Sequence, residues 1–230
     1  MASSEAPRAL ERAEAYAASG EYAKALVEAD RAIALEPDLA EAHTQRGWDL
    51  ENLGSMRLLE AREAYETALE LDPGDLWAAL GLATVLTRLG EVEAAERLDR
   101  RVVDEAPARL RAEPYLAEAL GWAQFRVGMH SAAIETLRAA AEADADDVAV
   151  RLDLALVLLV AGHRDEALRE LGRAIDDADA GTRGHLAVAL DDLEATLAER
   201  PGLSTFGGND ARTMLAAALG RMSTRMPVGR

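Results

Sequence analysis

The stretch from Gly54 to Pro73, GSMRLLEAREAYETALELDP, contains the pattern that decides the fold. Ala61, Tyr65 and Ala68 recur at a spacing of i, i+4 and i+7, which places them on one face of a helix. The glycine before this helix and the proline after it mark its boundaries. Because the two alanines are small, we expect this face to be buried against a closely packed second helix.

The same arrangement recurs five times along the chain. Glycines follow the first helix of each unit at Gly20, Gly54, Gly90, Gly128 and Gly162. A small residue follows inside the second helix at Ala25, Ala61, Ala95, Ala133 and Ala167. Proline closes the first three units at Pro37, Pro73 and Pro107, whereas Ala145 and Asp179 stand at the equivalent places of the last two. A helix pair cannot bury its apolar face alone, so the pattern predicts a stack of pairs.

This series resembles the tetratricopeptide repeat, a helix-turn-helix unit of roughly 34 residues. The small residue of the first helix is Ala13, Gly47, Ala83, Gly121 and Ala155. Tyr16, Tyr22 and Tyr65 match aromatic positions of the family, whereas leucine, valine or polar residues stand at the others. The resemblance implies an all-α protein, a right-handed superhelical stack of about five such repeats, with a concave groove that receives a peptide.

We expect the chain to be organised around these repeats. Residues 1–5 form a disordered N-terminus, and residues 6–181 form the five repeats, 6–39, 40–75, 76–109, 114–147 and 148–181. Residues 182–200 form a capping helix with an apolar stripe of leucines. Residues 201–230 form a linker and a short amphipathic tail helix. Two insertions, near Ser55–Arg57 and Leu110–Glu113, should loosen the packing locally.

The tail helix is expected to begin near Asn209 or Asp210, both of which are good N-caps. Its apolar face comprises Met214, Leu215, Ala218, Leu219 and Met222. Arginines beside this face complement the acidic body of the protein. The tail helix could therefore dock in the groove of its own chain, or two chains could associate through residues 209–222. The alternative is a frayed terminus or one further packing helix.

The register of the repeats predicts which side chains of the first helices face the groove. They are Glu11, Glu14, Glu41, Gln45, Trp48, Glu51, Asn52, Trp77, Thr84, Arg88, Tyr115, Glu118, Trp122, Phe125 and Arg126. All three tryptophans are included, and large aromatic residues are efficient anchors for a ligand. The alternative is that each tryptophan only fills the seam between neighbouring units.

One well-known groove of this family binds acidic chaperone C-termini through a clamp of Lys, Asn and Arg side chains. The corresponding places here hold Leu10, Glu14, Gln45, Trp77 and Gly81. None of these residues holds a carboxylate by charge, so a co-chaperone of that kind is disfavoured. We expect instead a peptide with basic or apolar side chains, held by ion pairs and cation–π contacts.

Composition excludes several classes of partner and compartment. The net charge of −17 disfavours nucleic acid and anionic membranes as partners. The alternative explanation of this charge is that the acidic residues simply keep the surface soluble. There is no cysteine, the first residues lack a secretory apolar core, and the longest apolar run, Leu154–Ala161, is too short to span a membrane. We therefore expect a cytoplasmic protein. Arginine is abundant while Lys24 is the only lysine, which points to a GC-rich, bacterial coding sequence.

Catalysis finds little support in the sequence. The histidines His43, His130, His163 and His185 lie in different units without metal-ligand spacing, and no glycine-rich phosphate loop follows a strand. We expect no metal, no cofactor and no enzyme activity. Two function classes stay open: a scaffold that binds a peptide, and an accessory subunit that assembles through its outer surface or with itself. An enzyme is a remote third.

Overall fold

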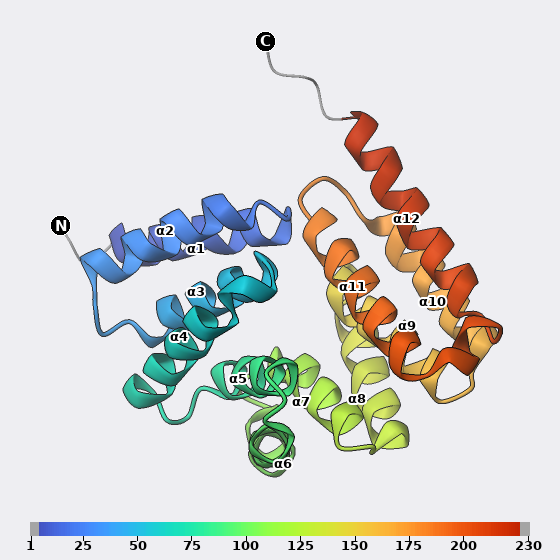
Figure 1. Ribbon diagram of the computed structural model, residues 1–230, viewed down its shortest axis with the longest axis horizontal. Coiled ribbons are helices and arrows are strands. Elements are labelled where there is room, and N and C mark those ends of the chain that lie inside the picture. The colour runs from blue at the N-terminus through green and yellow to red at the C-terminus, as the bar shows by residue number, and fades with distance from the viewer. Residues whose placement is uncertain (1–4, 226–230) are drawn as a thin grey trace. The chain divides into compact units, whose positions relative to one another are not determined.

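The computed structural model describes residues 5–225, in which twelve α-helices and two short 3₁₀ helices follow one another without a strand (Figure 1). The expected all-α repeat fold is confirmed. The expected disordered N-terminus lies outside the described residues except for Glu5, which begins the first helix. Among residues 5–225, no helix combines the length and apolar character that crossing a membrane requires.

The chain divides into two compact units, Met1–Gly128 and Met129–Arg230, which are called unit 1 and unit 2. The helices of unit 1 are α1 (Glu5–Ala18), α2 (Tyr22–Leu35), α3 (Ala40–Asn52), α4 (Leu58–Leu71), α5 (Leu76–Arg88), α6 (Val92–Arg109) and α7 (Leu116–Arg126). Each helix packs against the next, and α3 and α5 also pack against the first helix of the preceding pair. The turn glycines Gly20, Gly54 and Gly90 have φ values of 79°, 120° and 85°, a backbone region that favours glycine and ends the preceding helix.

Tyr65 explains why two neighbouring first helices carry glycine. Its ring is 1% exposed and lies between α3 and α5. A Cβ atom added at Gly47 would lie 2.8 Å from this ring, and one added at Gly81 would lie 2.3 Å from its Cζ. Ala61 and Ala68 beside it are fully buried. The expected burial of this face of α4 is confirmed.

Proline does not close the third unit as expected. Pro107 lies inside α6, which continues to Arg109. Proline removes one backbone hydrogen bond from a helix, but the last turn gains contacts elsewhere. Arg109 donates to the carbonyl oxygen of Gly74 at 2.5 Å and to the carboxylate of Glu113 at 2.6 Å, so it fastens the extended helix to the loop before α5.

Unit 2 is built around one almost entirely apolar helix. Its helices are α8 (His130–Ala143), α9 (Val148–Val160), α10 (Arg164–Asp177), α11 (Arg183–Glu199) and α12 (Gly208–Arg225), with a 3₁₀ turn at Pro201–Ser204. The central helix α9 packs against α8, α10 and α11, and α12 packs against α10 and α11. Ala211, Leu215 and Ala218 of α12 are buried, so the apolar face of the tail helix is used within unit 2.

Candidate functional site

All fifteen side chains expected to face the groove belong to unit 1. Helix α1 carries two of them, α3 five, α5 three and α7 four, and the remaining one, Tyr115, is the N-cap of α7. The repeat register therefore assigns these residues to one series of first helices. Burial and side-chain pairing divide them into an aromatic group, a paired group and an acidic group.

The aromatic group follows one face of α7. Tyr115, Trp122 and Phe125 recur at intervals of seven and three residues, which gives a stripe along the helix. Tyr115 is 59% exposed, and the rings of Trp122 and Phe125 lie 5.3 Å apart between centroids. We call these three residues the aromatic stripe.

The three tryptophans are neither fully buried nor fully exposed. Trp77 and Trp122 each pack one side against the apolar cluster around Leu76, Leu116 and Leu120. One part of a half-buried indole fills a seam between helices, while the rest stays accessible.

Arg126 is fixed inside the protein by the preceding pair of helices. Its Nε donates to Asp99 Oδ2 at 3.0 Å, and its Nη1 donates to Thr84 Oγ1 at 2.5 Å. The two charged side chains are 15% and 5% exposed. Burial raises the pKa of Asp99 to about 6, although the charge and hydrogen bonds of Arg126 lower it. Arg126 therefore joins α7 to α5 and α6.

Glu51 is also occupied, so the site differs from the expected row of accessible acids. Its residue is 6% exposed. One carboxylate oxygen lies 3.3 Å from Nη1 of Arg88, and the other accepts a hydrogen bond from the hydroxyl of Tyr65 at 3.3 Å. The carboxylate thus joins α3 to α4 and α5 and has little surface left for a ligand.

Exposed acids remain at the other end of this series of helices. Glu11 and Glu14 of α1 and Glu41 of α3 are exposed. The pKa of Glu14 is raised, first by partial burial and then by the negative charge of Glu11. A positive group placed here would relieve that repulsion. The candidate site therefore combines an acidic end with an aromatic end.

Sequence reasoning missed the buried carboxyl of Asp49. Asp49 is 0% exposed, and its Oδ1 accepts a hydrogen bond from Nε2 of Gln45 at 2.8 Å. Its Oδ2 has no hydrogen-bond partner among the described residues. Burial raises the pKa of Asp49 to about 8, the hydrogen bond from Gln45 lowers it, and the charge of Asp30 raises it further.

The repeat register contained the signal for this carboxyl. Asp49 stands two residues after the small residue of its first helix. The same place holds Val85, Ala123 and Val157 in the following units, and all three are buried. An acid at a place that is otherwise apolar indicates a buried polar group rather than a surface charge.

No metal centre can be built from the described part of the chain. Within residues 5–225, no group of three or more His, Cys, Asp or Glu side chains could hold an ion. One ring nitrogen of His43 instead lies 2.9 Å from the carbonyl oxygen of Pro37.

The paired helices with small residues at their contacts define an α-helical repeat protein. Two tetratricopeptide repeat models match the sequence, one over residues 53–122 and one over residues 128–188. Together they cover more than half of the chain. The chain belongs to the tetratricopeptide repeat family.

The chain is similar to several solved structures at low sequence identity. The thermophilic TPR protein TTC0263 of Thermus thermophilus is 23% identical, with a TM-score of 0.58, and the match covers 80% of this chain and 98% of that one. PilF of Pseudomonas aeruginosa is 17% identical, with a TM-score of 0.49, over 98% of this chain and 95% of that one. YrrB, described as a TPR protein with an unusual peptide-binding site, is 22% identical, with a TM-score of 0.40, over 74% and 84%. No curated protein matches the sequence.

Proposed function

We propose that the chain is a scaffold that binds a protein partner, and that unit 1 takes a peptide segment with basic and apolar side chains. The membership of the tetratricopeptide repeat family supports protein–protein interaction as the general role. The observation that carries the finer proposal is the aromatic stripe of α7, which offers accessible rings on the face where the register predicts the groove. Aromatic anchors of this kind dominate binding energies at interfaces.

The charge of the peptide follows from which side chains are already paired. The two arginines of this face are bound to carboxylates of the chain, at 3.3 Å for Arg88 and 3.0 Å for Arg126. The exposed acids Glu11, Glu14 and Glu41 are therefore its main accessible charges. Lysine or arginine in the peptide would meet these carboxylates, while its apolar side chains would contact the aromatic stripe.

A binding experiment tests both halves of this proposal. A library of basic and acidic peptides is titrated into the full chain while tryptophan fluorescence is recorded, since Trp48, Trp77 and Trp122 are the only tryptophans. We expect basic peptides with aromatic or leucine side chains to bind. Trp122→Ala should weaken binding at least about tenfold, the scale of a hot-spot residue.

The acidic end needs its own matched control. The triple variant Glu11→Gln, Glu14→Gln and Glu41→Gln should weaken binding of the same peptides. The control triple changes three exposed glutamates of the second helices or the turns that follow them, Glu36, Glu70 and Glu93, to glutamine. If both triple variants lose the same affinity for the peptides, the effect is due to net charge alone. If the first triple variant loses no affinity, Glu11, Glu14 and Glu41 do not contact the peptide.

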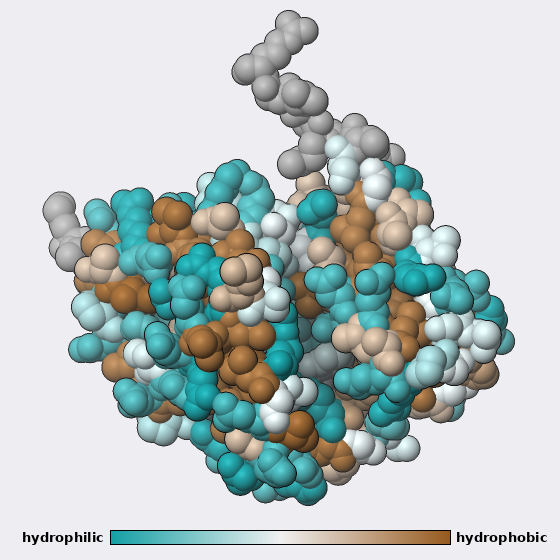
Figure 2. All heavy atoms as spheres, viewed as in Figure 1, coloured by the Kyte–Doolittle hydropathy of each residue, from teal (hydrophilic) through white to brown (hydrophobic). Residues whose placement is uncertain are grey.

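Exposed apolar side chains favour a second candidate, assembly through the outer surface. Met56 is 98% exposed on the 3₁₀ turn Ser55–Arg57, and Leu59 and Val92 are 64% and 57% exposed. Figure 2 shows hydrophobic residues in patches among hydrophilic ones on the surface in view. If these side chains mediate assembly, Met56→Gln together with Leu59→Gln should lower the molecular mass measured by light scattering, while peptide binding stays unchanged.

A further inference from the structure

In the fifth repeat, the face that corresponds to the groove consists of leucines. Leu152, Leu156 and Leu159 of α9 stand at the same distances from the small residue of their helix as the groove-facing residues of α7 do from theirs. They are 4%, 8% and 2% exposed, whereas Trp122 and Phe125, which correspond to Leu156 and Leu159, are half-buried. Something in unit 2 covers this face, which we call the leucine face.

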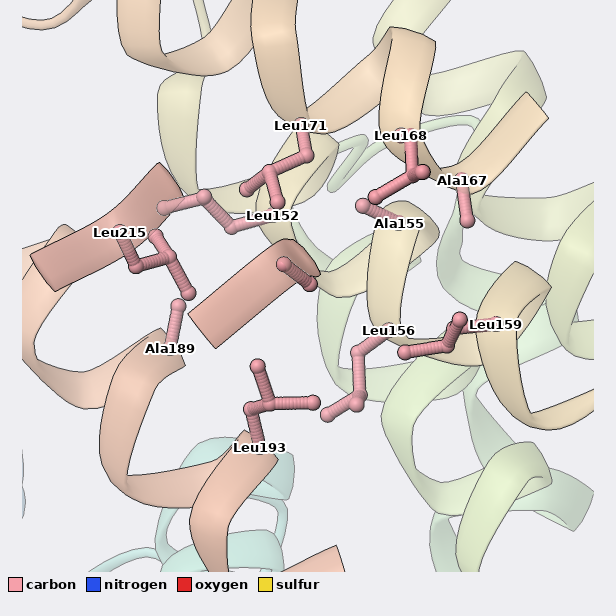
Figure 3. Close-up of a pocket in the computed structure, with 11 residues that line it drawn as sticks. Leu152, Ala155, Leu156, Leu159, Ala167, Leu168, Leu171, Ala189, Leu193 and Leu215 are labelled. Carbon is pink, nitrogen blue, oxygen red and sulfur yellow. The ribbon is translucent and has the colours of Figure 1, made fainter. Parts of the chain in front are cut away.

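The covering elements are α11 and α12 of the same unit. Figure 3 shows Leu193 of α11 pointing toward Leu156, with Leu215 of α12 beside Ala189 of α11. These side chains and Leu152 line one common apolar cavity. The leucine face is therefore filled from within the chain.

Helix α11 does not pack in the way that the first helix of a following repeat would pack. In the regular array, the second helix of one pair packs extensively against the first helix of the next, as α2 does on α3 and α8 on α9. After the fifth repeat, α11 keeps the contact with the preceding first helix, α9, but α10 packs extensively against neither α11 nor α12. A Cβ atom added at Gly172 of α10 would lie 3.9 Å from Cε of Met214 in α12. Helix α12 thus makes the larger contact with α10, while α11 lies on the leucine face of α9.

The fit of α11 is incomplete. A cavity of about 20 Å³ remains between the leucine face and its cover, and its lining is apolar except for backbone atoms. The covering helices contribute Ala189 and Ala211 to it, where larger side chains would reach further. Leu186, Leu193 and Leu197 are the buried leucines of α11, while Glu194 and Ala195 on its other side are exposed. An amphipathic helix with leucines at this spacing is therefore the ligand shape that the face accepts.

We propose that the leucine face of α9 is a binding site for an amphipathic helix of a partner protein, and that α11 is its resident occupant, displaced when the partner binds. The partner helix carries leucines at the spacing of Leu186, Leu193 and Leu197, with a side chain larger than alanine in place of Ala189. A second copy of this chain is a weaker candidate, because its α11 makes the same contacts that the first copy already has within itself. This site is independent of the peptide site in unit 1.

A displacement experiment on the full chain tests the proposal. The probe is a fluorescently labelled synthetic peptide of residues 183–199, and a second version carries Ala189→Val. Leu193→Asp in the full chain removes the resident helix from the face, whereas Ala195→Asp places the same charge on the exposed side of α11. The apparent affinity for an external helix rises when the fraction of open face rises.

We expect the Leu193→Asp chain to bind the peptide at least about tenfold more tightly than the wild type or the Ala195→Asp control. The Ala189→Val peptide should bind more tightly than the parent peptide, and adding Leu156→Asp should abolish binding of both. Circular dichroism checks that each variant keeps its helices, and the milder Leu193→Ala should give a smaller gain in the same direction.

Two results would overturn the proposal. In one, a folded Leu193→Asp or Leu193→Ala chain binds the peptide no better than the wild type, which would make α11 a permanent part of the core. In the other, Leu193→Ala turns the chain into a dimer without gaining affinity for the peptide, which would assign the face to a second copy.

Discussion

Asp49→Asn should make unit 1 more stable near neutral pH and remove most of the pH dependence of its unfolding above about pH 6, where Asp99 no longer titrates. Burial raises the pKa of Asp49 to about 8 in the folded chain, against ~3.9 in an unfolded chain. Between these values the folded state holds a proton that the unfolded state has released. The contribution of Asp49 to stability is therefore fully present below about pH 4 and is lost as the pH rises toward 8.

The magnitude follows from the separation of the two pKa values. Each pH unit between them changes the free energy of unfolding by about 1.4 kcal/mol, so the loss from pH 4 to about pH 7.5 is about 5 kcal/mol. This is a large part of the roughly 5–15 kcal/mol that stabilises a typical domain. Asparagine keeps the shape of the side chain but has no proton to lose.

Urea titrations at several pH values between about 4 and 8.5 measure this effect. Tryptophan fluorescence reports unit 1 selectively, because all three tryptophans lie before Gly128. Asp99→Asn is the matched control: it makes the same chemical change at a buried carboxyl whose pKa is raised only to about 6, so its effect on stability should stay constant above that pH. The reasoning fails if the difference between wild type and Asp49→Asn is the same at every pH.

Three further predictions concern packing, pairing and binding. Gly81→Ala should lower the free energy of unfolding by about 3 kcal/mol, because its Cβ would overlap the ring of Tyr65. Gly220→Ala has open space around it and should raise the free energy of unfolding by up to about 1 kcal/mol. Urea unfolding followed by circular dichroism measures both values, and equal effects would contradict the packing argument. Arg126→Ala should lower the free energy of unfolding by about 3–5 kcal/mol, because it leaves Asp99 buried without its partner. Adding Asp99→Leu should recover much of this loss. If the double variant is no more stable than Arg126→Ala alone, the ion pair is not the cause of the loss. Raising the salt concentration from about 0.05 to about 0.5 M should weaken binding of basic peptides several-fold, as measured by fluorescence titration, and salt-independent affinity would exclude the acidic end from the contact.

The repeat architecture could be predicted from the sequence because its signals are local. Gly20, Gly54 and Gly90 end helices through backbone conformations that other residues rarely adopt. Small residues such as Ala61 and Ala68 at helical spacing require close helix contacts, and these contacts are present. The aromatic stripe of α7 could be located for the same reason, since its spacing along one helix is a property of the sequence alone.

Side-chain pairing between distant segments depended on the tertiary structure. Glu51 counts as one more groove acid in the sequence, but it is buried because Arg88, 37 residues later, and Tyr65 reach its carboxylate. The burial of Asp49 likewise depends on helices that fold around it. These side-chain contacts depend on how whole helices pack against one another. The periodicity of a single helix does not determine that packing.

The sequence by itself therefore determined the helices and their turns, because these depend on residues within one or two turns of one another. Only the tertiary structure decided which helix faces are covered by other segments. Leu156 and Leu159 of α9 hold the places in the repeat that Trp122 and Phe125 hold in α7, yet the two leucines are covered by α11 and α12. The physical reason is that burial depends on the packing of segments far apart in the chain, and Leu193 covers Leu156 only after the chain has turned back on itself.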